Sequence, residues 1–224
     1  MCGRYTLIAP ERIAKAYPRF HPAGAEFSQT RLPRYNVAPT QPVLGVRNDG
    51  NDRIEAFRWG FLPSWSESPS PAPLINARAE TLAVKPAFRN ALRLRRCVLF
   101  ADGFYEWRQK KPVYFTLADG VPFAFAALWE PGHGAPPSCV IVTCASNALV
   151  GQIHERMPVI LTPDALALWL APEELPAEVA SSVLQPYDPA KMCAHDASTR
   201  LNNAGYDAPD VLVDDDPVQQ SLGF

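Results

Sequence analysis

The spacing of apolar and polar residues along the chain predicts more strands than helices. Apolar residues three or four positions apart predict helices over residues 10–17, 86–96, 146–155, 162–170 and 172–184. Short runs rich in β-branched and aromatic residues predict strands over residues 43–47, 53–61, 97–107, 112–117, 122–130, 138–145, 156–161 and 192–198. The stretch NDGND at residues 48–52 predicts a hairpin between the first two of these strands.

The order of these elements predicts the fold class. Strands that follow one another with helices inserted between them indicate a single α+β domain with a mainly antiparallel, barrel-like sheet and peripheral helices. The domain is expected over residues 1–210, and the acidic residues 211–224 are expected to form a flexible tail. Two long loops rich in proline, residues 21–42 and 62–81, interrupt the elements. Loops of this length inside a domain are usually functional.

Formal charge divides the chain into two unlike halves. Residues 1–111 hold 18 Lys and Arg against 9 Asp and Glu, whereas residues 112–224 hold 3 against 14, within a net charge of −2. This asymmetry predicts one basic and one acidic face, although a charge-rich half can equally be an ordinary solvated surface. The arginines that could face a phosphate backbone are Arg4, Arg31, Arg34, Arg78, Arg89, Arg93, Arg95 and Arg96.

Cysteine and histidine usage excludes several classes of protein. The five cysteines include no CxxC pair, which predicts reduced thiols and a cytoplasmic location. No apolar run reaches the length of a membrane span, and the N-terminus has no signal-peptide pattern, so no membrane partner is expected. The four histidines show neither HExxH spacing nor a zinc-type Cys/His set, and Gly-rich phosphate loops are absent. No metal, nucleotide or other cofactor is therefore expected.

The opening residues MCGRYT place a cysteine directly after the initiator methionine. Aminopeptidases remove methionine before a small residue, and Cys2 would then carry a free α-amine and a thiol on adjacent carbons. These groups titrate near about 8 and about 8.5, so both are usable nucleophiles at neutral pH. The alternative is an incidental cysteine at a frayed terminus.

Three polar residues stand within otherwise apolar, rigid stretches. Asn76 follows an apolar pair, and His154 comes just before an apolar strand. Glu106 lies between Tyr105 and Trp107, whose rings would raise its carboxyl pKa by desolvation and make it a candidate general acid or base. Each has a purely structural alternative, because Asn76 could cap a turn, Glu106 could pair with an arginine and His154 could be a satisfied histidine at a helix end.

Six ordered motifs together resemble one family. MCGRYT, YNVAPTQ, WGFLPSW, INARAET, FADGFYEW and IHERMPVIL are similar to the motifs of the SOS response-associated peptidase (SRAP) family, also called abasic site processing proteins, from residue 2 to about residue 205. The resemblance implies that Cys2, exposed by removal of Met1, forms a thiazolidine crosslink with the aldehyde of an abasic site in single-stranded DNA. It assigns the remaining catalytic roles to Asn76, Glu106 and His154, and it also implies an associated lyase activity.

The resemblance further implies how the DNA is bound. Loop aromatics would stack on bases beside the lesion, arginines would contact the backbone, and proline-stiffened loops would form a preformed channel. The residues expected to do this are Arg4, Asn36, Pro39, Phe61, Trp65 and Arg78. The expected partners are single-stranded DNA with abasic sites and replication-fork proteins, and the protein is expected to be a monomer that associates with the nucleoid when bound to DNA.

Three other functions remain open from the residues alone. A glutamine amidohydrolase with an N-terminal nucleophile also begins Met-Cys-Gly, but it would give Glu106 and His154 no role. A non-covalent module for single-stranded DNA would use the arginines and aromatics and leave Cys2 incidental. A protease acting on other proteins would need a Ser/His/Asp or Cys/His arrangement that the motifs do not provide.

Overall fold

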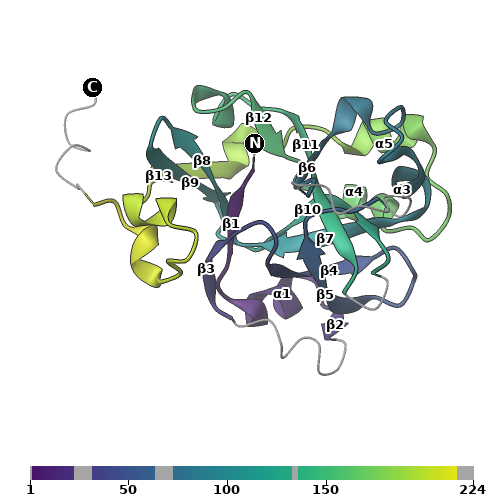
Figure 1. Cartoon of the computed structure of the whole chain (residues 1–224), viewed down its shortest axis with the longest axis horizontal. Coiled ribbons are helices and arrows are strands. Elements are labelled where there is room, and N and C mark those ends of the chain that lie inside the picture. Colours follow the sequence, from purple (N-terminus) through teal and green to yellow (C-terminus); the bar gives the residue numbers. More distant parts are fainter. Residues whose placement is uncertain (1, 23–31, 64–72, 133–135, 216–224) are drawn as a thin grey trace.

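The strands form two sheets, and the N-terminal part of the chain contributes strands to both (Figure 1). The structure is a computed structural model that describes residues 2–22, 32–63, 73–132 and 136–215. The five-stranded sheet has the order β13-β9-β8-β1-β3, and the eight-stranded sheet has the order β12-β11-β10-β7-β4-β5-β2 with β6 beside β11. Most pairings are antiparallel, which confirms the α+β fold class with a mainly antiparallel sheet.

The five-stranded sheet holds the first strand of the chain at its interior. Its strands are β1 (Arg4–Leu7), β3 (Arg34–Val37), β8 (Gly103–Arg108), β9 (Lys111–Leu117) and β13 (Met192–Asp196). β1 is antiparallel to β8, with Arg4 opposite Tyr105 and Thr6 opposite Gly103. A tyrosine ring occupies the space that a Cβ on Gly103 would need, with the nearest ring atom 2.4 Å from that position, so the close packing here requires glycine.

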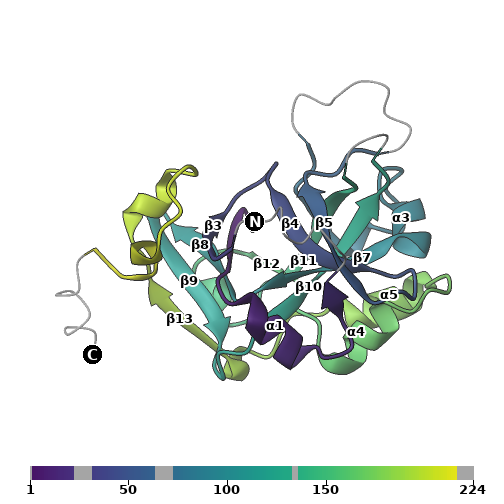
Figure 2. The ribbon, with the colours of Figure 1, turned by 90° about the horizontal axis from the view of Figure 1, so that it is seen from below.

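The eight-stranded sheet curls into a ring. Its strands are β2 (His21–Pro22), β4 (Pro42–Arg47), β5 (Arg53–Trp59), β6 (Asn76–Arg78), β7 (Arg96–Ala101), β10 (Phe123–Glu130), β11 (Ser138–Ala145) and β12 (Arg156–Pro158). β4 and β5 form the predicted hairpin. A short parallel pairing of β5 with β11 closes a circuit of strands through β4, β7 and β10, so the barrel-like character is confined to this sheet (Figure 2).

The predicted strand over residues 97–107 is two strands in different sheets. β7 ends at Ala101 and β8 begins at Gly103, and Asp102 stands between them. The Asp102 carboxylate accepts hydrogen bonds from the backbone N–H groups of Ile8 and Ala9, while its own N–H donates to the Thr6 carbonyl. These contacts bend the chain from one sheet into the other, and the sequence pattern does not reveal the bend because both halves are apolar.

The helices are short and lie outside the sheets. They are α1 (Pro10–Ala16), α3 (Arg89–Leu94), α4 (Pro163–Trp169) and α5 (Ala177–Val183), with 3-10 turns η1 (Ala79–Thr81), η2 (Val150–Gln152), η3 (Pro189–Lys191), η4 (Thr199–Asn202) and η5 (Pro209–Leu212). Thr162 caps α4 as predicted, accepting from the Ala165 N–H. α5 begins only after Pro176, and the helix predicted over residues 146–155 is reduced to η2. None of the helices in the described ranges is long and apolar enough to cross a membrane.

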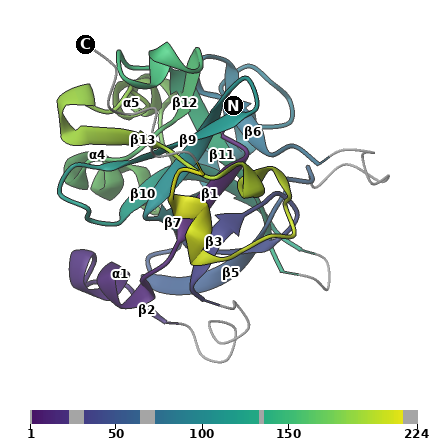
Figure 3. The same cartoon turned by 90° about the vertical axis from the view of Figure 1, so that its left-hand side faces the viewer.

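Two apolar cores lie on opposite sides of the five-stranded sheet. The larger fills the space between the sheets and includes Phe57, Trp59, Phe104 and Phe125, all fully buried. The smaller gathers residues of β8 and β9 with the C-terminal turns and consists of Tyr105, Tyr114, Ala197, Leu201 and Val211. Figure 3 shows these C-terminal turns, in yellow, in front of β1 and β3.

The packed part of the chain extends past residue 210. Val211 is fully buried, Asp214 pairs with Lys111 at 3.1 Å, and the Asp215 carboxylate accepts hydrogen bonds from Ser198 and Thr199. The first residues of the expected flexible tail therefore belong to the folded domain, because their acidic side chains find donors there. Residues 216–224 lie outside the described residues.

Candidate functional site

The four residues with expected catalytic roles come from four separate places in the chain. Cys2 precedes β1, Asn76 opens β6, Glu106 lies in β8 and His154 lies between η2 and β12. β11 supports the strands next to two of them: β6 runs parallel to it from Asn76, opposite Ile141, and β12 runs antiparallel to it from Arg156, two residues after His154 and opposite Ala145. β1 brings the other two together, because its pairing with β8, continued by one residue, sets Gly3 alongside Glu106.

Asn76 is hydrogen-bonded directly to Cys2. Its side-chain Nδ2 donates to the backbone carbonyl of Cys2 at 2.8 Å. Its Oδ1 is buried and has no hydrogen-bond partner within the described ranges. Asn76 thus holds the Cys2–Gly3 peptide unit and keeps one acceptor available inside the site.

Glu106 is a buried carboxyl group with a raised pKa. It is 3% exposed, and its burial raises the pKa, while the positive charge of protonated His154 acts in the opposite direction. Glu106 and His154 therefore interact electrostatically in the folded chain. The expected direction of the shift is confirmed.

The expected cause of that shift is wrong. Side chains alternate along a strand, so Glu106 points away from the face that carries Tyr105 and Trp107. Those two rings pack in the smaller core, whereas Phe104, on the same face as Glu106, packs in the larger one. The desolvation of Glu106 therefore comes from the inter-sheet side and not from its aromatic neighbours in the sequence.

The Cys2 thiol is fully buried and protonated at neutral pH. Burial raises its pKa strongly, and the nearby negative charge of Glu106 raises it further. The Sγ–H group points at the Arg4 carbonyl, 3.9 Å away. In this structure the thiol is therefore in its neutral S–H form and not in the reactive thiolate form.

His154 has one nitrogen committed to the protein. The backbone N–H of Arg156 donates to His154 Nδ1 at 3.0 Å. Since Nδ1 accepts, the neutral imidazole carries its proton on Nε2 and can donate from that atom.

A second layer of polar residues, which the sequence reasoning missed, supports this arrangement. The Arg156 guanidinium binds both carboxylate oxygens of Glu80, at 2.8 and 3.0 Å, and the Thr143 carbonyl at 2.6 Å. The hydrogen bond to Arg156 lowers the pKa of Glu80. The Thr143 hydroxyl donates to the Ala77 carbonyl at 3.4 Å, next to Asn76. In the sequence, the signal for this layer was Arg156, a charged residue at the start of an otherwise apolar strand.

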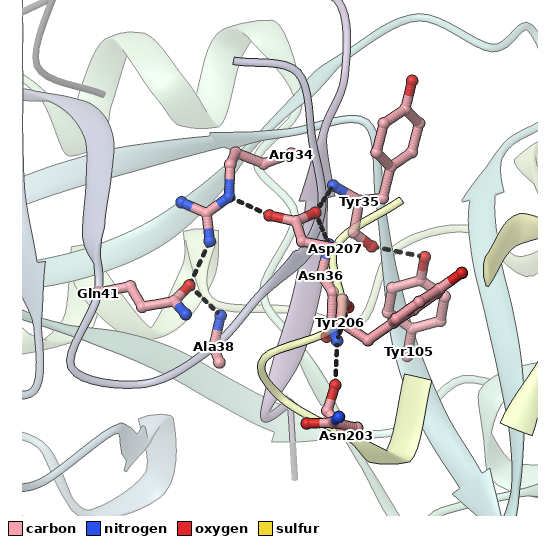
Figure 4. A network of polar contacts seen from close by, with 9 residues as sticks. All are labelled: Arg34, Tyr35, Asn36, Ala38, Gln41, Tyr105, Asn203, Tyr206 and Asp207. Atoms are coloured by element: carbon pink, nitrogen blue, oxygen red, sulfur yellow. Dashed lines mark hydrogen bonds and ion pairs between the residues drawn. The ribbon is translucent and has the colours of Figure 1, made fainter. Parts of the chain in front are cut away.

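Two of the expected DNA contacts are internal instead. Asn36 is fully buried, and its Nδ2 donates to three backbone carbonyls of the C-terminal turns. Figure 4 shows its contact with Asn203. Phe61 is also fully buried and packs against Phe88 with ring centroids 5.6 Å apart. Neither side chain can reach a base, because each is covered by segments that are distant in the sequence.

The other expected DNA contacts are not excluded by burial. Arg78 is exposed and lies two residues after Asn76 on β6, while Pro39 is half-buried in the turn after β3. Arg4 is half-buried, with its guanidinium 6.0 Å from the centroid of the Trp107 ring. Trp65 lies outside the described residues.

The expected basic face is smaller than the charge count suggests. Arg34 pairs with Asp207, Arg93 with Glu174 and Arg95 with Glu130, so cations of the first half bind anions of the second. Arg96 is fully buried and donates to five backbone carbonyls at the ends of α3 and α4. Arg31 lies outside the described part of the chain, and among the other candidate arginines Arg4, Arg78, Arg89 and Arg96 form no ion pair within the described part. Part of the charge asymmetry is therefore used in ion pairs that join residues 1–111 to residues 112–224.

No group of three or more His, Cys, Asp or Glu side chains in the described ranges is arranged to hold a metal ion. The groups that the site does contain are a thiol, a buried carboxyl group, an imidazole and an amide.

Comparisons with known proteins agree with the motifs. The family model described as SOS response associated peptidase matches residues 1–204. A Bacillus subtilis relative named abasic site processing protein YoqW is 39% identical and covers 95% of this chain and 99% of its own. The Escherichia coli protein named abasic site processing protein YedK is 32% identical over 82% of this chain and 85% of its own. A crystal structure of a Bacteroides thetaiotaomicron protein, 25% identical, superimposes with a TM-score of 0.80 over 94% of this chain and 98% of that one.

Proposed function

The chain belongs to the SOS response associated peptidase family, and we propose that it captures abasic sites in single-stranded DNA as a covalent thiazolidine on Cys2. The observation that carries the proposal is the convergence of Asn76, Glu106 and His154 on the N-terminal cysteine from distant parts of the chain. The names of the relatives YoqW and YedK support the choice of substrate.

The chemistry requires Cys2 to be the first residue. The ring-opened sugar of an abasic site presents an aldehyde, to which the α-amine of Cys2 adds to give a carbinolamine. Loss of water gives an imine, and addition of the thiol S–H across the C=N bond closes a five-membered ring. The net change is protein plus aldehyde minus one water. Because a nitrogen acylated by Met1 cannot form the imine, Met1 must be removed first.

The order of the two nucleophiles follows from the thiol pKa. Burial and the charge of Glu106 keep the Cys2 thiol protonated, so the amine reacts first. The Cys2 side chain then needs only to rotate its sulfur from the Arg4 carbonyl towards the imine carbon. Ring closure is intramolecular and therefore has a high effective concentration.

Each neighbouring side chain has a role that its geometry allows. Asn76 holds the Cys2 carbonyl and thereby orients the α-amine, with Oδ1 able to accept from the amine or a sugar hydroxyl. Glu106, with its raised pKa, donates the proton that expels water from the carbinolamine. His154 donates from Nε2 to a sugar hydroxyl or phosphate oxygen. If a base removes a C2′ proton from the imine before ring closure, the 3′ phosphate leaves, which accounts for a lyase side reaction.

Arg4, Arg78 and Pro39 are the described residues proposed to contact the DNA. Replication-fork proteins, nucleoid association and a monomeric state remain parts of the proposal. A single-stranded substrate suits a buried nucleophile, because an unpaired sugar can be turned into the site without breaking base pairs.

Intact-mass spectrometry tests the proposal directly. After incubation with a single-stranded oligonucleotide that holds one abasic site, protein lacking Met1 should gain the oligonucleotide mass minus one water. Cys2→Ser is the matched control, since serine closes an oxazolidine that hydrolyses readily, and its adduct should not survive heating. Processed protein that forms no adduct, or an equally stable adduct in Cys2→Ser, would refute the thiazolidine. Release of ammonia from glutamine would instead favour the amidohydrolase.

A further inference from the structure

His154 is carried by a short turn whose first residue is a buried asparagine. Asn147 is 8% exposed, and its Oδ1 accepts the N–H groups of Leu149 and Val150 at 3.1 and 2.9 Å. Its backbone carbonyl accepts from Gly151, and the Val150 carbonyl accepts from the His154 N–H at 2.9 Å. One side-chain atom thus organises the turn that ends at His154.

The other atom of the same amide ties the turn to a distant segment. Asn147 Nδ2 donates to the Tyr187 carbonyl at 2.7 Å, and it lies 3.2 Å from the sulfur of Met192. Tyr187 follows α5, and Met192 opens β13. The anchor is therefore outside the sheet pairing that holds β12.

The far end of the turn is fixed independently. β12 pairs with β11, and the Arg156 N–H holds His154 Nδ1. With both ends held, the imidazole has one defined orientation. Freeing the first end would let the ring shift away from the Arg156 N–H that fixes its tautomer.

We propose that Asn147 is a positioning residue for His154. It works through the turn and does not touch the substrate. Asparagine suits the position because it supplies an acceptor to the turn and a donor to Tyr187 from one short side chain. Aspartate keeps the acceptor and lacks the donor, and alanine lacks both.

This inference rests on the proposed function for its kinetic consequence. Misplacement of a catalytic group by about 1 Å can cost on the order of 100-fold in rate. Asn147→Ala should therefore slow single-turnover crosslinking by about 10–100-fold with little change in DNA affinity. Asn147→Asp should give an intermediate loss, and it keeps the caps of the turn in case Asn147→Ala folds poorly.

A kinetic double-mutant cycle distinguishes positioning from general damage. Asn147→Ala combined with His154→Ala should crosslink no more slowly than His154→Ala alone, because the first change acts through the second residue. Asn48→Ala is the matched control: Asn48 is 5% exposed and bonds the Arg96 N–H and the Leu94 carbonyl, at the end of β7 remote from β8. It should lose stability and keep the wild-type crosslinking rate. Multiplying rate losses, or a wild-type rate in folded Asn147→Ala, would overturn the proposal.

A measurement that needs no DNA separates this inference from the proposed function. In ¹⁵N NMR, assigned by comparison with His154→Ala, the wild-type ring should show the Nε2–H tautomer, and Asn147→Ala should show averaging of the two tautomers. An unchanged His154 spectrum would refute the positioning role even if crosslinking occurs. If the wild type forms no adduct but the spectrum changes as expected, the proposed function fails and the positioning role stands.

Discussion

Replacing Asn36 by alanine should destabilise the fold by about 2 kcal/mol and leave DNA capture unchanged. Asn36 Nδ2 contacts the carbonyls of Leu201, Asn203 and Tyr206 at 3.4, 3.1 and 2.8 Å. Its two N–H groups can make two full hydrogen bonds, each worth about 1 kcal/mol net. The Asn203 carbonyl keeps the Tyr206 N–H as a donor, and the loss of this donor at the Leu201 and Tyr206 carbonyls adds about 1 kcal/mol.

One feature of the same side chain reduces this cost. Asn36 Oδ1 is buried and finds no partner in the described part of the chain, so alanine also removes an unsatisfied acceptor. That offsets about 1 kcal/mol. Asn36→Asp should be worse than alanine, because it presents carboxylate oxygens to three carbonyl oxygens.

Urea unfolding followed by tryptophan fluorescence measures the effect. With a slope of about 2 kcal/mol/M, the midpoint should fall by about 1 M for Asn36→Ala and further for Asn36→Asp. The crosslinking rate of folded Asn36→Ala should equal that of the wild type. A midpoint within about 0.2 M of wild type, or a large loss of DNA affinity in a stable protein, would refute the structural role and restore Asn36 as a DNA contact.

Three further changes test other parts of the structure. Unfolded Glu106 loses its proton near about pH 4.3 and the folded carboxyl keeps it to higher pH, so the wild type loses stability as pH rises between these values. Glu106→Gln should therefore match the wild type thermally at pH 4 and melt higher at pH 8, while crosslinking more slowly; equal melting shifts at both pH values would contradict the raised pKa. Phe61→Ala, at a fully buried ring, should cost about 3–5 kcal/mol in urea unfolding; a stable variant with weakened DNA binding would return Phe61 to the DNA surface. Arg96→Met removes the guanidinium donor from five carbonyls, of which that of Arg93 still accepts from the Leu175 N–H, and it should cost about 3 kcal/mol or more in the same assay; a neutral result would show that water replaces the guanidinium.

The sequence predicts an element well where the signal for it lies within a few residues of that element. The β4–β5 hairpin follows from NDGND, and the Thr162 cap precedes α4 as expected. The bend at Asp102 and the late start of α5 were missed. The bend depends on β1, far away in the sequence, whereas Pro176 gave a local signal for the start of α5 that the periodic pattern outweighed.

The candidate site shows the same division. The motifs pointed to Cys2, Asn76, Glu106 and His154, and the structure brings them together, although their catalytic roles stay a prediction. The motifs did not reveal that Asn147 anchors the turn before His154, because an asparagine in a short apolar stretch looks the same whether it faces solvent or caps a buried turn.

The sequence by itself determined the chemical groups and the local elements, since side-chain identity and the two-residue period of a strand are local properties. Only the tertiary structure decided which groups are available. Asn36 and Phe61 are internal, several arginines are paired across the two halves, and Glu106 is desolvated from the side opposite its aromatic neighbours. Burial and charge pairing depend on what packs from distant positions: Asn36 is covered by a segment 165 to 170 residues away. No local pattern contains that information.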